Sequence, residues 1–172
     1  SLAFIHLTKT GRYIMFVACL VIYALLLTVT YVPGVGKSTI LADQNFAIYV
    51  DRLVFGRFDD GTRYTWLLSG FGFTATTLSG LFAGELIKSK LPRKKVALYL
   101  FVFGVAAILI GVIWSIWHPI VKIIWTSSFV LASSGGCLLL LALFYWIIDV
   151  KGWVNWSFPL KVIGMNAIAA YV

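Results

Sequence analysis

Charged residues are scarce in this 172-residue chain and make up only 12% of it. A soluble domain carries about 25% charged residues. Hydrophobic residues make up 61% of this chain, and its mean hydropathy is +0.97. A soluble domain of this length could not bury so much apolar surface. The composition therefore excludes a soluble globular domain and predicts that lipid surrounds most of the chain.

Residues that commonly carry chemistry are also few. The chain has two cysteines and two histidines. Cys19 and Cys137 lie in apolar runs, which is typical of small buried hydrophobic residues. Neither the cysteines nor His6 and His118 have a metal-ligand spacing, and we read His118 as an interfacial residue without a catalytic role. We therefore predict no metal site and no catalytic residue in this sequence.

Long intervals without charge dominate the sequence. Residues 123–148 contain no charged side chain, and this interval exceeds the roughly 20 residues that a helix needs to cross a bilayer. Aromatic residues lie at both of its ends, as at the two interfaces of a spanning helix. By the same criteria we expect spans near residues 13–31, 66–87, 96–117 and 126–148, with a fifth span starting near residue 162.

The predicted fold class is thus all-α. We expect a polytopic transmembrane helix bundle with four complete spans, the start of a fifth, and one long polar outer loop at residues 32–63. Residues 1–172 would form a single transmembrane domain. Because the stretch after residue 162 is too short to cross a bilayer, we expect this domain to be part of a larger multi-span protein.

The cations predict the orientation of these spans. Five lysines and arginines cluster in residues 88–95, so this loop should be cytoplasmic. Residues 9–12 and 149–161 then lie on the same side, and the long loop lies outside. The net charge of +8 comes from short loops, so it does not indicate a nucleic-acid partner. For the cluster itself, contact with anionic lipid and a specific site for a phosphorylated ligand are the two alternatives.

The outer loop contains one helical pattern. Apolar residues at 46, 49, 50, 53 and 54 have helical spacing, and Gly56 is a natural end for a short amphipathic helix. Asp51 and Arg52 are adjacent, so they should point to different faces of it.

Two other patterns invite a functional reading. Residues 33–39 (PGVGKST) resemble part of a phosphate-binding loop, but its first glycine is missing and a membrane span precedes it, so we interpret it as a turn. Small residues at 133–137, and the Gly80/Gly84 spacing, are typical of close helix packing.

Several segments, taken together and in order, resemble the heparan-alpha-glucosaminide N-acetyltransferase family and its bacterial relatives. The resemblance covers about residues 30–172. The segments that carry it are residues 47–53 (AIYVDRL) with Gly56, residues 78–84 (LSGLFAG), Pro119 with Lys122, Trp125 and Ser128, residues 148–153 (IDVKGW) and residues 164–168 (GMNAI).

The resemblance implies a multi-span membrane acyltransferase. It implies acetyl-CoA as the co-substrate at the cytoplasmic face and an amino sugar or another sugar as the acceptor on the outer side. In the family the catalytic histidine lies in an amino-terminal half that has no counterpart here, so we expect this chain alone to be inactive and to need those spans as partners. Two departures, residues 63–66 (RYTW) and Val121, concern the outer side and hence acceptor specificity.

Candidate binding residues follow from the predicted sides. For the acceptor, polar or aromatic residues at the outer end, together with one amide in the last span, are the candidates: Asp51, Arg52, Lys122, Trp125, Ser127, Ser128 and Asn166. For the phosphates of the donor, the cytoplasmic cations are the candidates: Lys88, Lys90, Arg93, Lys94, Lys95 and Lys151. For Asn166, a hydrogen bond between helices is the alternative.

Two other classes of function remain open. A permease or transporter for a small solute would show inverted repeats and broken helices, and no internal repeat is visible. A structural subunit without chemistry is the other alternative. We expect an integral multi-pass protein, and assembly as a homo-oligomer is left open. In a bacterium, it would lie in the inner membrane.

Overall fold

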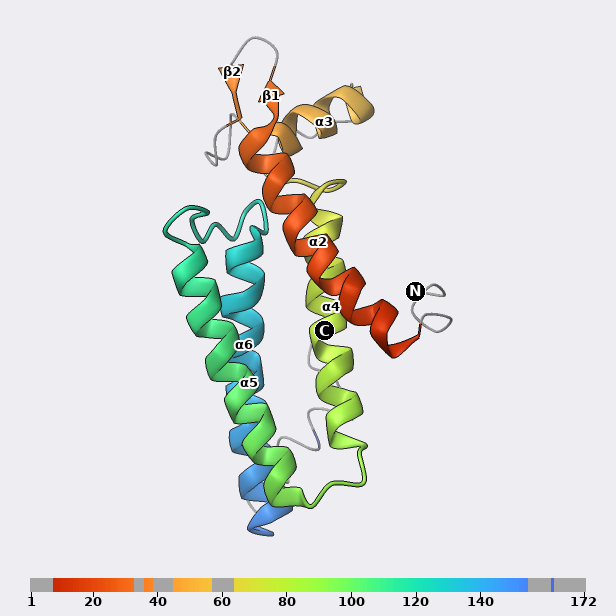
Figure 1. Cartoon of the computed structure of the whole chain (residues 1–172), viewed down its shortest axis with the longest axis vertical. Coiled ribbons are helices and arrows are strands. Elements are labelled where there is room, and N and C mark those ends of the chain that lie inside the picture. Colours follow the sequence, from red (N-terminus) through yellow and green to blue (C-terminus); the bar gives the residue numbers. More distant parts are fainter. Residues whose placement is uncertain (1–7, 33–35, 39–44, 57–63, 155–161, 163–172) are drawn as a thin grey trace.

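The structure is a computed structural model, and it describes residues 8–32, 36–38, 45–56, 64–154 and 162. Helices dominate these residues (Figure 1). The elements are α2 (Lys9–Val29), β1 (Tyr31–Val32), β2 (Gly36–Lys37), α3 (Phe46–Phe55), α4 (Ser69–Ile87), α5 (Arg93–Trp114), α6 (Ser127–Tyr145) and the π-helix η2 (Trp146–Val150).

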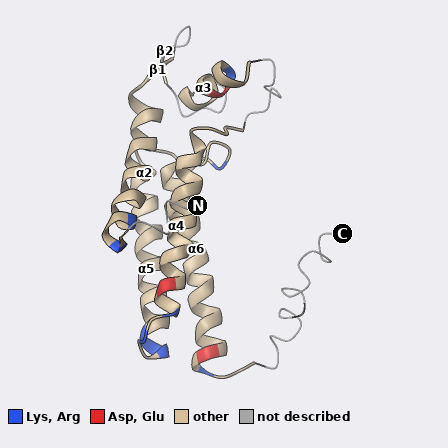
Figure 2. Ribbon diagram, turned by 90° about the vertical axis from the view of Figure 1, so that its right-hand side faces the viewer, with Lys and Arg blue, Asp and Glu red and all other residues tan. Residues whose placement is uncertain are grey.

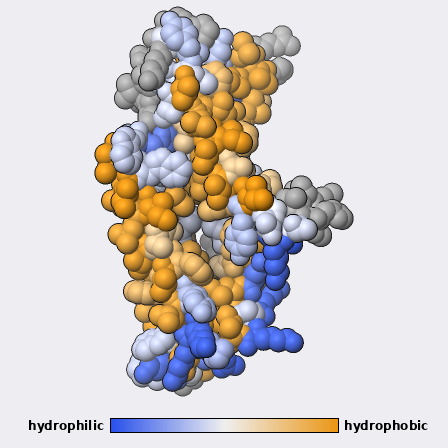
Figure 3. Space-filling model, viewed as in Figure 1, coloured by the Kyte–Doolittle hydropathy of each residue, from blue (hydrophilic) through white to orange (hydrophobic). Residues whose placement is uncertain are grey.

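Within these described ranges, three helices are long and apolar enough to cross a membrane: α2, α5, and α6 continued by η2. In the most apolar stretch of each helix, only 28% of the residues are buried for α2, 28% for α5, and 22% for α6 with η2. Most of their apolar surface therefore faces outward. Figure 3 shows this surface as a broad hydrophobic region with hydrophilic residues gathered at the lower end. This arrangement indicates an integral membrane protein.

Helix α4 lies between these elements and is less apolar. It has 19 residues, which is long enough, but serines, threonines and glycines interrupt its apolar positions. It is not among the three helices that qualify as spans. Three of the four predicted complete spans therefore correspond to helices that are long and apolar enough to cross a membrane, and four complete spans stay a prediction. The fifth predicted span lies almost entirely outside the described residues.

The ends of the helices differ from the predicted ends by a few residues. Helix α5 begins at Arg93, because Pro92 precedes it at a position where a missing N–H group is tolerated. It ends at Trp114, where the backbone turns and the N–H group of His118 bonds to the Trp114 carbonyl at 2.9 Å. At the other end of the hairpin, the helical structure continues through η2 to Val150.

Helices α5 and α6 form a closely packed antiparallel pair (Figure 1). A Cβ atom added to Gly104 would lie 3.0 Å from the Gly135 carbonyl oxygen, and one added to Gly135 would lie 2.7 Å from the Gly104 carbonyl oxygen. Only glycine permits so close an approach of two backbones. The predicted packing role of residues 133–137 is thus confirmed at Gly135.

Gly80 and Gly84 of α4 do not have this role. A Cβ atom added to either glycine would meet no described atom within 4 Å. The prediction that this pair packs closely against another helix is therefore wrong for the part of the chain that the structure describes. The physical reason is that α4 packs on α2 through other residues, with Tyr13 stacked on Phe82 at a ring distance of 4.6 Å.

The end of the molecule opposite the cations is closed by a small cap. The short strands β1 and β2 pair antiparallel, with Tyr31 opposite Lys37. Helix α3 ends at Gly56, whose φ of 50° suits glycine, as the sequence predicted. Ala47 of α3 joins Tyr23, Leu27 and Ile124 in one buried cluster. The cluster fixes α3 and the 115–126 connection to the same end of α2.

Candidate functional site

Those predicted acceptor residues that the structure describes lie at this capped end, and Asp51 is the more buried of the two on α3. Only 4% of Asp51 is exposed. Its side-chain oxygens accept hydrogen bonds from the backbone N–H groups of Trp66, at 2.6 Å, and Leu67, at 3.0 Å. These N–H groups precede α4 and have no helical partner of their own. Asp51 therefore fixes α3 to the start of α4.

Arg52 points away from this contact and is exposed on α3, as its position next to Asp51 predicted. Lys122 is exposed in the connection before α6. Arg52 is on the same helix as Ala47, and Lys122 is two residues before Ile124. Because Ala47 and Ile124 lie in one buried cluster, Arg52 and Lys122 belong to the same end of the molecule. Binding of the acceptor by Arg52 and Lys122 stays a prediction.

The remaining described acceptor candidates lie at the start of α6, where Ser127 and Ser128 are buried, and just before it, where Trp125 is half-buried. The Ser127 hydroxyl donates to the Leu20 carbonyl at 2.7 Å, and the Ser128 hydroxyl donates to the Pro119 carbonyl at 3.1 Å. Trp125 has a φ of 54°, and its indole N–H donates to the Thr76 hydroxyl at 3.2 Å. These bonds tie α6 to α2, to α4 and to the preceding loop. Asn166 lies outside the described residues.

The predicted donor cations gather at the other end of the molecule (Figure 2). All are exposed: Lys88, Lys90, Arg93, Lys94, Lys95 and Lys151. The Arg93 guanidinium donates to the Asp149 carbonyl oxygen at 3.1 Å, so the start of α5 touches η2. The Lys151 ammonium lies 4.9 Å from the centre of the Trp146 ring. The fold thus brings Lys151 to the cluster of residues 88–95, although they are far apart in sequence.

Between the two ends lies a cleft of about 530 Å³ that the sequence did not predict. It is lined by residues of α2, α4, α5 and α6, and Figure 3 shows a hollow in this region of the surface. At mid-length, the Ser79 hydroxyl donates to the Ser134 hydroxyl at 3.1 Å, which joins α4 to α6. The cleft therefore has a polar contact at mid-length.

The cleft becomes charged toward the cation end. Lys9 and Glu85 line it, and Glu85 forms an ion pair with Arg12 of α2. From the sequence, residues 9–12 were expected on the same side as the cation cluster, and Glu85 had no predicted role. Their pairing across two distant helices could not be found from spacing. The sequence did contain an indication of the pair. Arg12 and Glu85 each border an apolar segment, where a charged side chain needs a partner.

His118 is a further buried polar residue near the capped end. Its exposed fraction is 1%, and within the described part of the chain neither ring nitrogen has a hydrogen-bond partner. Burial lowers the pKa of His118 because desolvation disfavours the charged imidazolium. Its interfacial position was predicted, and its complete burial was not.

No group of three or more potential metal ligands occurs among the residues that the structure describes. No protein-family model, curated protein or solved structure matches this chain. The family resemblance of the sequence consequently stays a prediction, and the geometry of the ends and the cleft must carry any functional argument.

Proposed function

We propose that this chain is part of an integral membrane acyltransferase that takes an acetyl group from acetyl-CoA at the cytoplasmic face and delivers it to an amino sugar on the outer side. The observation that carries the proposal is the cleft of about 530 Å³ lined by α2, α4, α5 and α6. It is charged at the cation end, at Lys9 and Glu85, and polar at mid-length, at Ser79 and Ser134. Transfer across a bilayer requires a polar path of this kind, since apolar walls alone do not stabilise a polar reacting group.

The distribution of charge supports the same proposal. The phosphates of a CoA thioester would meet the exposed cations of residues 88–95 and Lys151. The acceptor would approach from the end where Arg52 and Lys122 are exposed. Asp51, Ser127 and Ser128 would support that end through their bonds to the backbone. In a bacterium the enzyme would lie in the inner membrane.

The test uses the full-length protein in vesicles loaded with glucosamine, with labelled acetyl-CoA added outside. Labelled N-acetylglucosamine inside the vesicles is the expected product. Ser79→Leu should fill the cleft and lower turnover at least roughly tenfold, a barrier change of about 1.4 kcal/mol. Thr77→Leu is the matched control, because Thr77 is exposed on the same helix and bonds only to the Phe73 carbonyl of its own helix. Equal turnover in the two variants would reject the cleft as the path.

A permease for a small solute is the second candidate, and the Arg12–Glu85 pair favours it. Arg12 lies in the first turn of α2 and Glu85 in the last turn of α4, and ionisable residues at membrane depth often mark transport pathways. In the same vesicles, a permease would release labelled glucosamine without acetylating it. Release of labelled glucosamine with no acetylated product would therefore favour a permease over an acyltransferase.

A further inference from the structure

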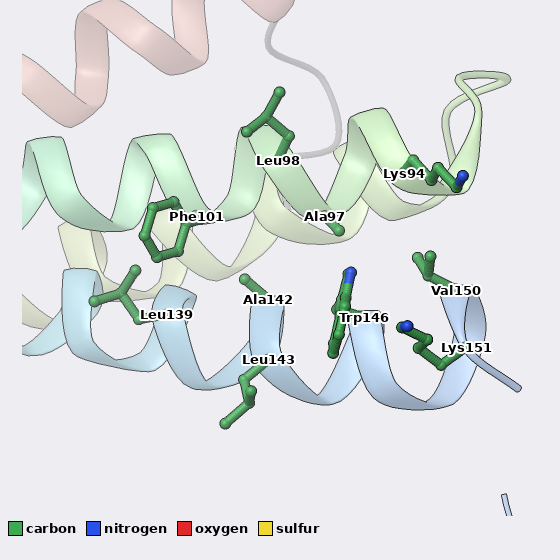
Figure 4. A pocket seen from close by; sticks show the side chains of 10 residues that line it. All are labelled: Lys94, Ala97, Leu98, Phe101, Leu139, Ala142, Leu143, Trp146, Val150 and Lys151. Atoms are coloured by element: carbon green, nitrogen blue, oxygen red, sulfur yellow. The ribbon is translucent and has the colours of Figure 1, made fainter. Parts of the chain in front are cut away.

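A second hollow lies at the cation end of the molecule, on the surface of the α5–α6 pair. It is an open groove of about 840 Å³ between the start of α5 and the end of α6 with η2. Figure 4 shows its walls: Phe101 of α5 and Leu139 and Ala142 of α6 lie along its length, and the Trp146 ring stands across it. This groove is distinct from the cleft between α4 and α5.

The groove has two chemically different parts. Along the helices its walls are apolar, and they belong to α5 and to α6 with η2, which are both long and apolar enough to cross a membrane. At its end lie Lys94 and Lys151. Arg93 and Lys95 flank Lys94 in the sequence, and Asp149 is the only acid in residues 88–154. The local charge at this end is therefore strongly positive.

We propose that this groove binds an anionic phospholipid, with the lipid phosphate between Lys94 and Lys151 and one acyl chain along Phe101, Leu139 and Leu143. Charge complementarity selects the head group, and basic pockets between membrane helices are suited to anionic head groups. The apolar walls select the chain, because a soluble phosphorylated ligand would leave them uncovered. The Trp146 ring lies where an interfacial aromatic residue packs against the top of an acyl chain.

The local backbone suits this role. The π-helix at Trp146–Val150 widens the last turns of α6, and the Arg93 bond to the Asp149 carbonyl keeps η2 beside α5. Lys151 follows η2 directly and lies over the Trp146 ring. Its long side chain can reach the interface while its stem covers apolar surface. The inference does not depend on acyl transfer.

The test is a titration of the purified full chain in detergent with phosphatidylglycerol or phosphatidylcholine of identical acyl chains, followed by native mass spectrometry. Phosphatidylglycerol should bind more tightly. A lysine near an anionic surface contributes about 1 kcal/mol, so Lys94→Gln with Lys151→Gln should weaken its binding roughly 30-fold. The matched control is Lys88→Gln with Lys90→Gln, which removes the same charge from the neighbouring loop, outside the groove. The control should retain wild-type affinity for this lipid.

A second measurement uses phosphatidylglycerol with brominated chains, which quench tryptophan fluorescence on contact. Wild type should lose more fluorescence than Trp146→Phe, and the difference should shrink with the phosphatidylcholine analogue. Equal losses of affinity in the groove variant and the loop variant would show a diffuse charge effect and overturn the proposal.

Discussion

At the scale of single residues, three buried polar side chains at the capped end bond to the backbone. Asp51, Ser127 and Ser128 each satisfy backbone groups of another segment. Such bonds stabilise the junctions between α2, α3, α4 and α6, where a peptide group would otherwise lose its hydrogen bond in an apolar surrounding. Asp51 and Ser128, which belong to the segments of the predicted family resemblance, therefore also stabilise contacts between segments of the fold.

Replacing Asp51 tests this interpretation. Asp51→Ala would leave the N–H groups of Trp66 and Leu67 without their partner, and an unsatisfied buried donor costs about 1–3 kcal/mol. We expect a lower thermal unfolding midpoint in detergent. Val54→Ala on the same helix is the control, since Val54 is 60% exposed. Identical midpoints for the two variants would contradict the bond's role.

His118 should make the free energy of unfolding depend on pH. Burial lowers the pKa of His118, so the folded state binds fewer protons than the unfolded state just below the ordinary histidine pKa of about 6.5. The free energy of unfolding should then fall as the pH drops from about 6.5 toward the lower pKa of the folded state. His118→Phe should lack this decrease. Midpoints measured at acidic and neutral pH for both proteins provide the test, and equal decreases would exclude His118 as the cause.

At the scale of the elements, the sequence located the helices well and their partners poorly. Charge-free intervals predicted α5 and α6 to within a few residues, because hydropathy reports contact with lipid directly. The same glycine-rich signal occurs at Gly80 and at Gly135, yet only Gly135 packs against another backbone. Which glycine packs depends on the position of the neighbouring helix, and one sequence does not encode that position locally.

Two adjacent glycines make this packing testable. A Cβ atom at Gly135 would approach the Gly104 carbonyl oxygen and Ile108 to 2.7 Å, so Gly135→Ala must push α5 and α6 apart, and overpacking costs about 1–3 kcal/mol. Gly136→Ala meets no described atom within 4 Å and gains helix propensity. We expect the first variant to lower the unfolding midpoint and the second to keep or raise it. A midpoint for Gly135→Ala at or above that of Gly136→Ala would refute the close contact.

At the scale of the whole molecule, the two ends have different characters. One end carries exposed cations from the α4–α5 connection and from Lys151, and the other carries the cap of β1, β2 and α3 (Figure 2). The ion pair between Arg12 and Glu85 links the start of α2 to the last turn of α4. The side of the membrane on which each segment lies stays a prediction. The cleft and the groove could not be predicted, since both arise from the spacing between helices.

The orientation of these ends in the membrane is the last prediction. Short basic loops are retained on the cytoplasmic side, so residues 88–95 should face the cytoplasm and α3 should face outward. In a chain with Cys19 and Cys137 replaced, Val54→Cys should react with a membrane-impermeant thiol reagent in intact cells. Lys90→Cys should react only after permeabilisation. Both residues are exposed in the structure, so a lack of labelling would reflect the membrane barrier and not burial. Labelling of position 90 but not of position 54 in intact cells would reverse the orientation, and it would place the cations on the side opposite to cytoplasmic acetyl-CoA.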